Sequence, residues 1–166
     1  MKNKLLAIIM AFCVLAPLAD FAGAQTDGRE IDAVLTAAET FFVKLRAKEY
    51  KTVWGLLTEK SQETIVKDTG KSLAKSAVKH TREEITADFN RGGPVAEAYW
   101  QGYLSTFDPD TVLSQSAWSM GLLKKDRAEI NLLYKKAEKP AVLKMSREKG
   151  VWKVGLVETF WSRNPD

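Results

Sequence analysis

Cysteine and histidine are almost absent from this chain, which limits the chemistry that it can perform. The 166 residues include one cysteine, Cys13, and one histidine, His80. A single cysteine forms no disulfide within the chain, and Cys13 lies in an N-terminal segment that we expect to be removed. The rest of the chain then offers no thiol nucleophile and no thiolate ligand for a metal. We therefore predict no metal site and no cofactor, and a fold that depends on a packed core.

Short catalytic motifs and a strong charge of one sign are also missing. The sequence has no glycine-rich phosphate loop, no serine-centred nucleophile motif and no pair of acids at metal-binding spacing. No histidine is placed by the sequence beside any of the four serines Ser61, Ser114, Ser116 and Ser119. The formal net charge of +4 is modest for a nucleic-acid-binding protein, so no nucleic-acid partner is expected.

The first 24 residues have the three regions of a secretory signal peptide. Lys2 and Lys4 precede an apolar stretch over 5–18, and small residues follow up to Ala24. The apolar stretch is shorter than the roughly 20 residues that span a bilayer. We predict a signal peptide over 1–24, cleavage near Ala24, and a single periplasmic or secreted domain over 25–166. The alternative is a segment that stays attached as a membrane anchor.

The first half of the remaining chain has helical periodicity. The spacing of Asp27 and Glu30 is that of a capping box and predicts a helix start. Apolar residues then recur at helical spacing: Ile31, Val34, Leu35, Ala38, Phe41, Phe42 and Leu45. Further helices are predicted over 50–57, from Thr58 past Val66, over 73–89, and from Pro94 onward.

After residue 110 the period changes to two, which is typical of strands with one buried face. The first predicted strand has the inward residues Trp118, Met120 and Leu122. The second has the inward residues Ala128, Ile130, Leu132 and Tyr134. Two more are predicted over 141–147 and 151–161. Because the connections are short, neighbouring strands must be antiparallel. The sequence predicts an α+β domain in which N-terminal helices pack on the concave face of a curved antiparallel sheet of about four strands.

This pattern resembles the nuclear-transport-factor-two-like superfamily. The resemblance rests on the helix over 31–45, the short helix over 50–57 followed by Thr-Glu-Lys-Ser at 58–61, and the closing strand over 150–154 with its Trp-Lys-Val core. It implies a cone formed by a sheet around a long helix, and often a homodimer through the open face of the sheet. The superfamily includes enzymes, transport adaptors, lipid carriers and uncharacterised exported domains, so it implies no single function. The stretch over 58–107 is longer and more helical than the usual core.

Glu158 is the candidate catalytic carboxylate. If the last strand continues past it, alternation places Glu158 on the same inner face as Trp152. A desolvated carboxylate there could act as a general acid or base together with Tyr134 or Tyr103. The alternative is a strand that twists near its end, so that Glu158 reaches solvent or pairs with Arg163.

Aromatic and basic residues supply the other candidates. The candidate ligand-pocket residues are Phe42, Tyr99, Trp100, Tyr103, Phe107 and Trp118, with Glu158 beside them. The alternative is a packed core, which is the usual role of aromatic residues at helical spacing. A basic stripe on one helix is predicted from Lys67, Lys71, Lys75 and Lys79. It is a candidate contact for an anionic surface, and the alternative, which the pattern favours, is a solvated helix face. His80 lies in a polar stretch and reads as a solvated side chain rather than a general base.

We therefore expect an exported, non-enzymatic domain that binds a small ligand or an envelope protein through the concave face of its sheet. One alternative is an isomerase or dehydratase that uses Glu158 and a tyrosine. The other is a periplasmic lipid carrier, which requires a deep dry cavity between the helices and the sheet.

Overall fold

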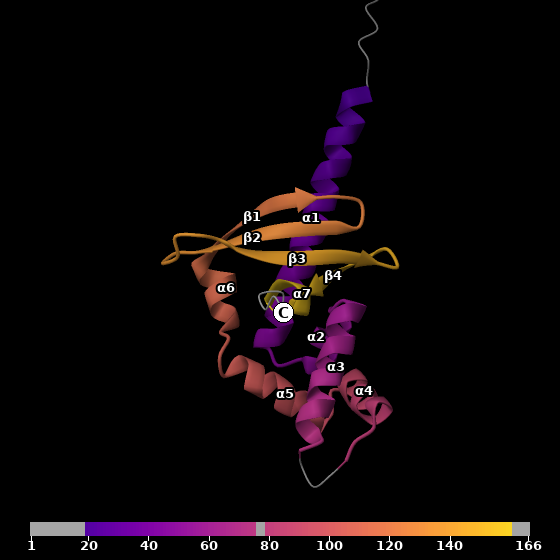
Figure 1. Ribbon diagram of the computed structural model, residues 1–166. Coiled ribbons are helices and arrows are strands. Elements are labelled where there is room, and N and C mark those ends of the chain that lie inside the picture. The colour runs from indigo at the N-terminus through magenta and orange to yellow at the C-terminus, as the bar shows by residue number, and fades with distance from the viewer. Residues whose placement is uncertain (1–18, 76–78, 161–166) are drawn as a thin grey trace, which may run out of the picture.

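A computed structural model describes residues 19–75 and 79–160 (Figure 1). Within these ranges the helices are α1 (Ala19–Arg46), α2 (Tyr50–Gly55), α3 (Glu59–Leu73), α4 (Arg82–Arg91), α5 (Pro94–Leu104), α6 (Pro109–Gln115) and α7 (Leu156–Phe160). The strands are β1 (Ser116–Leu123), β2 (Arg127–Tyr134), β3 (Ala141–Glu148) and β4 (Val151–Gly155). No helix of the described ranges is long and apolar enough to cross a membrane.

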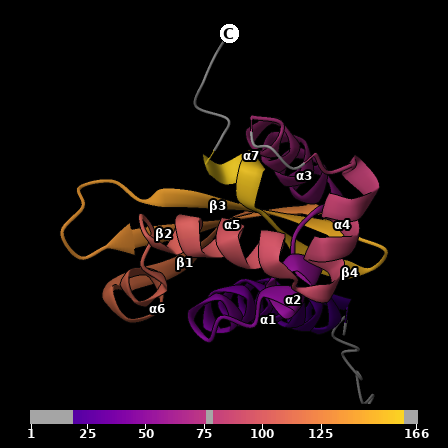
Figure 2. The same cartoon turned by 90° about the horizontal axis from the view of Figure 1, so that it is seen from below.

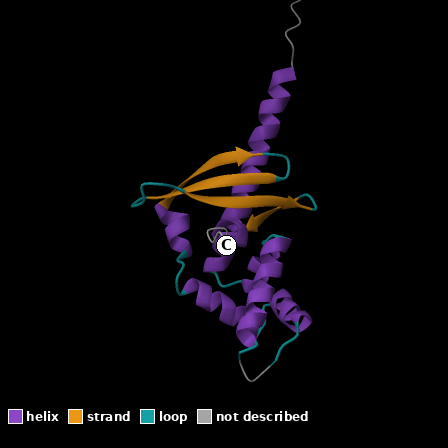
Figure 3. Ribbon diagram, in the orientation of Figure 1, coloured by secondary structure: helices purple, strands orange, loops and turns teal. Residues whose placement is uncertain are grey.

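The four strands form one open sheet in the order β1-β2-β3-β4, with every neighbouring pair antiparallel (Figure 3). The predicted α+β class and the consecutive meander are therefore confirmed. The turn between β3 and β4 has two residues, Lys149 and Gly150, with φ angles of 51° and 82°. Two positive φ angles give the turn a twist that matches the twist of the strands, which is why glycine suits its second position.

An irregularity in β1 changes which leucine faces the core. Met120 is opposite Ile130, but Leu123 is opposite Ala128, so β1 carries one more residue than β2 over this span. A bulge of this kind reverses the alternation beyond it. Leu123 is therefore partly buried against the core, whereas Leu122 is 41% exposed on the outer face. The prediction that Leu122 faces inward is wrong for this reason.

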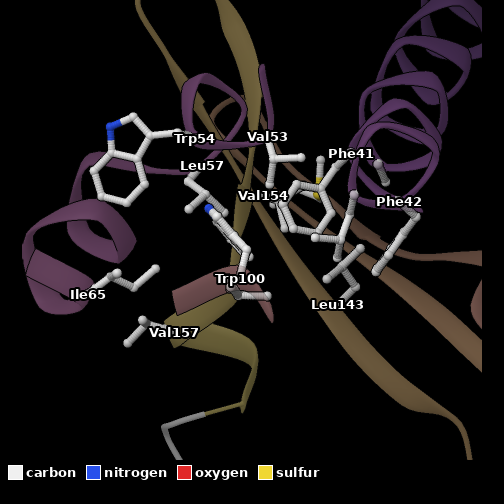
Figure 4. Close-up of a cluster of buried hydrophobic side chains, with 14 of the residues drawn as sticks. Phe41, Phe42, Val53, Trp54, Leu57, Ile65, Trp100, Leu143, Val154 and Val157 are labelled. Carbon is white, nitrogen blue, oxygen red and sulfur yellow. The ribbon is translucent and has the colours of Figure 1, made fainter. Parts of the chain in front are cut away.

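Helix α1 crosses one face of the sheet, which we call the inner face. Figure 2 shows α1 and α6 on this side and α3 and α7 on the other. The side chains of Phe41 and Phe42 are 0% exposed and pack with Leu143 and Val154 in the core (Figure 4). The predicted apolar stripe of the long helix is thus buried against the sheet, as its periodicity indicates.

Helix α1 begins earlier than the sequence predicts. It starts at Ala19, so Asp27 lies within the helix and not at its N-terminal cap. Residues 19–26 contain no proline and include three alanines, which favour a helix. Its first turns extend past the sheet (Figure 1). The other residues of the predicted signal peptide, Cys13 among them, lie outside the described residues.

One polar cluster fixes α1 on β3 and β4. The carboxylate of Glu30 accepts a hydrogen bond from Trp152 Nε1 and forms an ion pair with Arg147. The Arg147 guanidinium lies over the Trp152 ring, 4.8 Å from its centroid. A cation over an indole face is attracted by the ring quadrupole. The three side chains therefore set where α1 crosses the sheet.

The remaining helices α2 to α5 form a second layer beyond the β4 edge of the sheet (Figure 1). Leu57 forms a parallel bridge with Val154, which joins this layer to the last strand. The predicted helix over 73–89 is wrong in its first part, because α3 ends at Leu73 and α4 starts at Arg82. Thr81 and Glu84 form a capping box at that start. The signal was in the sequence, since a Thr followed three residues later by Glu marks a helix N-terminus.

The predicted fourth strand over 151–161 is also too long. Strand β4 ends at Gly155 and the chain continues as α7. A Cβ atom at Gly155 would lie 3.0 Å from the Lys144 carbonyl oxygen and 3.2 Å from Glu158 Cβ. Only glycine allows this close approach without a shift of its neighbours. The chain can therefore leave the sheet at once and turn back over its end.

We expect Phe42→Ala to lower the free energy of unfolding by about 3–5 kcal/mol, because it removes a fully buried ring from between α1 and the sheet. Leu122→Ala is the control, since that side chain lies on the outer face, and we expect a change of at most about 0.5 kcal/mol. Urea denaturation followed by circular dichroism measures both. Equal effects of the two substitutions would contradict the assignment of faces.

Candidate functional site

Several rings of the predicted aromatic pocket group pack against one another. Phe42 contacts Trp118 with ring centroids 5.9 Å apart, and Phe107 also at 5.9 Å. Tyr103 links Phe107 at 5.1 Å to Trp100 at 5.7 Å. These are ordinary separations for packed aromatic pairs. These rings therefore pack together between α1, α5 and the sheet, in line with the core that the sequence offered as the alternative to a pocket. Tyr99, from the same predicted group, lines a separate pocket between α3 and α5.

Burial changes the acidity of two tyrosines on α5. It raises the pKa of Tyr103 well above the ordinary value, and the nearby Tyr99 adds to the shift. Burial likewise raises the pKa of Tyr99, with a further contribution from the charge of Asp68. A buried phenol keeps its proton because the charged phenolate is poorly solvated. Neither hydroxyl is therefore prepared to give up its proton near neutral pH.

Glu158 lies on α7, not on a strand, and is held by two hydroxyl groups from the start of α3. Thr58 Oγ1 donates to Glu158 Oε1 at 2.8 Å, and Ser61 Oγ donates to Glu158 Oε2 at 2.6 Å. The Val157 backbone N–H donates to Ser61 Oγ at 3.1 Å. Thr58 and Ser61 are 1% and 0% exposed. We call these three side chains, Thr58, Ser61 and Glu158, the α3–α7 clamp. Arg163, the alternative partner, lies outside the described residues.

The hydrogen bonds of the clamp indicate a structural role for the Thr58 and Ser61 hydroxyls. Ser61 Oγ donates to a carboxylate, as a serine nucleophile does, but the residue is 0% exposed. Thr58 also caps α3 by accepting from the Ser61 backbone N–H at 3.1 Å. The Glu148 carboxylate accepts from the Glu59 backbone N–H at 3.0 Å. Two backbone N–H groups at the start of α3 therefore already have acceptors within the chain. One of these acceptors is a carboxylate, whose negative charge is favourable at a helix N-terminus.

A pocket of about 550 Å³ lies on the outer face of the sheet, beside the clamp. Strand alternation places Glu129 and Lys144 on this face, opposite the inward Ile130 and Leu143. The charged side chains that line the pocket are Lys60, Lys124, Arg127, Lys144, Glu129 and Glu158. We call this the outer-face pocket. Neither Tyr103 nor Tyr134 is among its lining residues.

The sequence reading missed the four cations of this pocket. Arg127 and Lys144 occupy polar positions of the strand alternation, which by themselves indicate only a solvated face. Lys60 comes from α3 and Lys124 from the β1–β2 turn, far apart in the chain. The only feature of the sequence that could have indicated this pocket is the number of cations at the outer-face positions of the strands. Their convergence depends on where α3 docks.

The predicted basic stripe is broken. Lys67 and Lys71 lie on α3, but Lys75 and Lys79 follow its end at Leu73 and do not continue its face. Helix α4 packs back against α3, and tertiary packing of this kind can override local helix propensity at the end of a helix. The Lys71 ammonium pairs with the Asp68 carboxylate at 3.0 Å. The predicted continuous stripe on one helix is therefore wrong.

His80 is exposed, as expected, and lines an open pocket of about 470 Å³ together with Lys67 and Arg82. In the described part of the chain no group of three or more histidine, cysteine, aspartate or glutamate residues is placed to hold a metal ion. A comparison of the sequence with known protein families, and of the chain with curated proteins and solved structures, finds no match. Any function must therefore be argued from the site itself.

We expect Glu158→Gln to lower the free energy of unfolding by about 1–3 kcal/mol, because an amide has one acceptor oxygen for two buried hydroxyl donors. Glu129→Gln removes the same charge from the same pocket without touching the clamp, and we expect it to change stability by at most about 0.5 kcal/mol. Thermal and urea unfolding of the two variants gives the comparison. A Glu158→Gln variant as stable as the wild type would contradict the clamp.

Proposed function

We propose that this protein is an exported, non-enzymatic binding domain whose outer-face pocket holds a ligand that bears carboxylate or phosphate groups. The ligand is a small molecule or an acidic segment of an envelope protein. The observation that carries the proposal is the convergence of Lys60, Lys124, Arg127 and Lys144 around one pocket. Two carboxylates share that pocket, so the cations are in excess.

The state of these cations supports an anionic ligand. None of the four forms an ion pair within residues 19–75 and 79–160, whereas cations elsewhere, such as Arg46 with Asp110, do so. Lysine and arginine side chains around a concave surface raise the local concentration of anions. Arginine also binds carboxylate and phosphate through two parallel hydrogen bonds. A volume of about 550 Å³ is in the range of small-ligand sites.

Two observations favour binding over catalysis. Both oxygens of Glu158 accept hydroxyl hydrogen bonds, so this carboxylate is committed to holding α7 on α3. The tyrosines considered as its partners are absent from the pocket lining. A general acid or base must lie within hydrogen-bond reach of the proton that it transfers.

The outer face also offers room for a protein partner, including a second copy of the chain. The exposed apolar residues Leu133 and Val142 lie on the same face as Lys144, on neighbouring strands. A charged pocket beside exposed apolar side chains is typical of a surface that a partner covers. The binding surface that we propose is thus the outer face, not the face under α1 that the sequence suggested.

We also propose that the chain is a distant member of the nuclear-transport-factor-two-like superfamily. The long helix across an antiparallel meander, followed by the short helix α2, supports this assignment. The sheet of this protein is open, and the long helical stretch over 58–107 forms a layer of its own at one edge.

Charge reversal of the outer-face pocket tests the ligand class. We expect the wild-type protein to bind citrate and a Glu-Glu-Glu tripeptide at low ionic strength, with shifts of the Glu129 and Lys144 amide signals in NMR titrations. The double variant Arg127→Glu with Lys144→Glu should bind both at least about tenfold more weakly, a change in binding free energy of at least about 1.4 kcal/mol.

The matched control is the double variant Lys136→Glu with Lys139→Glu in the exposed turn between β2 and β3. It makes the same change in net charge away from the pocket and should leave the affinity within about twofold, since exposed charges are screened beyond about 10 Å at 0.1 M salt. Equal losses in both double variants would mean attraction to net charge alone and would contradict the proposed site. Native mass spectrometry of the same samples reports whether a second copy binds.

Export has its own test. We expect the full chain, expressed in a bacterium with a C-terminal tag, to reach the cell envelope with an N-terminus at or near Gln25. Replacing Ala22 and Ala24 with glutamine should block processing, because the cleaved bond requires small residues before it. N-terminal sequencing measures the outcome, and a protein that retains Met1 in the soluble cytoplasmic fraction would contradict export.

A further inference from the structure

A second pocket lies between α3 and α5, and it shares no lining residue with the outer-face pocket. Its volume is about 410 Å³. Helix α3 contributes Asp68, Thr69 and Leu73 to the lining, and α5 contributes Val95, Ala98 and Tyr99. Apart from Asp68, these residues present mainly carbon atoms. We call it the α3–α5 pocket.

Two residues of this lining, Tyr99 and Thr69, have buried hydroxyl groups without a hydrogen-bond partner among the described residues. Tyr99 Oη and Thr69 Oγ1 are both shielded from solvent. Buried polar groups in folded proteins are nearly always paired, because an unpaired one loses its hydration without compensation. The two residues line the same pocket, Thr69 from α3 and Tyr99 from α5. A ligand oxygen that reaches these hydroxyls would supply the missing partner.

The charge around the pocket decides what kind of polar group fits. Asp68 lines the pocket, and its carboxylate is close enough to Tyr99 to oppose ionisation of the phenol. A carboxylate or phosphate group on the ligand would meet the same repulsion in a largely apolar space. The Asp68 carboxylate already forms an ion pair with Lys71, so a cationic group on the ligand is not needed to balance its charge. An uncharged polar group is therefore preferred.

We propose that the α3–α5 pocket binds an uncharged, mainly apolar small molecule that carries one hydroxyl or carbonyl group, which hydrogen-bonds with Tyr99 and Thr69. A cavity of roughly 150 Å³ holds benzene, so about 410 Å³ has room for a molecule of two fused rings. Because both hydroxyls lie below the lining surface, binding involves small side-chain movements that bring them to the ligand. The site is independent of the anionic ligand proposed for the outer face.

Two probes with the same ring system, one with a neutral hydroxyl and one with an anionic carboxylate, test this assignment. We expect 2-naphthol to shift the amide signals of Thr69, Val95 and Ala98 in NMR titrations of the mature protein. The anion 2-naphthoate has the same ring system and should bind at least about tenfold more weakly at this pocket. Equal affinity for both probes, or shifts confined to other regions, would overturn the proposal.

Substitutions at the pocket distinguish a ligand-binding role of the two hydroxyls from a structural role, because only a structural role would change the melting temperature of the free protein. Tyr99→Phe and Thr69→Val each remove a hydroxyl and keep the shape, so each should weaken 2-naphthol binding about three- to tenfold. Neither should lower the melting temperature of the free protein, because an unpaired buried hydroxyl contributes no hydrogen bond to the fold. Tyr103→Phe is the matched control, since Tyr103 is a partly buried tyrosine on α5 outside the pocket lining, and binding should be unchanged.

Filling the pocket provides the second line of evidence. Ala98→Trp places a large ring at its mouth and should abolish the 2-naphthol shifts while circular dichroism stays that of the folded protein. Binding that survives Ala98→Trp would place the probe elsewhere and overturn the site. Sedimentation velocity tests whether a second copy of the chain occupies the pocket instead. A wild-type dimer that dissociates with Ala98→Trp would mean that it does, and this result would also overturn the proposal.

Discussion

The burial of α1 on the inner face of the sheet is the interaction on which the rest of the structure depends. A helix repeats its apolar face about every 3.6 residues and a strand every two, and here both faces meet in one core. Phe41 and Phe42 are fully buried in it, and Glu30 binds Arg147 and Trp152 where the helix crosses the last strands. The side chains that meet on this face belong to the core of the described residues. The two pockets for which ligands are proposed lie away from this contact, on the outer face of the sheet and between α3 and α5.

The α3–α7 clamp determines what the outer face looks like. Gly155 lets the chain leave β4, and Glu158 then joins α7 to the start of α3 through Thr58 and Ser61. Thr159 Oγ1 accepts from the Lys144 backbone N–H at 2.9 Å, so α7 also covers part of the β3 edge where β4 has ended. An uncovered strand edge invites pairing with other chains. The clamp therefore protects the sheet and places Lys60 beside it.

The two pockets differ in chemistry because different elements form them. The outer-face pocket collects cations from strands, a turn and the start of α3, and suits an anion. The α3–α5 pocket is lined mainly by apolar atoms of two helices. Its lining residues Thr69 and Tyr99 carry hydroxyls without a hydrogen-bond partner among the described residues, and Asp68 adds a carboxylate. A single domain of this size can hold both, since helices that pack at one edge of a sheet leave grooves between them as well as against it.

The sequence by itself determined the elements whose pattern is long and regular. The stripe from Ile31 to Leu45, the alternation in β1 to β3 and the short turns fixed an antiparallel meander with a helix across it, because periodicity reports directly which face is buried. Only the tertiary structure decided where α3 ends, that the bulge turns Leu122 outward, and that Glu158 lies on a helix. Those outcomes depend on contacts between residues far apart in the chain, such as Glu158 with Ser61, and no local pattern contains them. The same reason applies to the outer-face pocket, whose four cations are scattered in sequence and meet only in the fold.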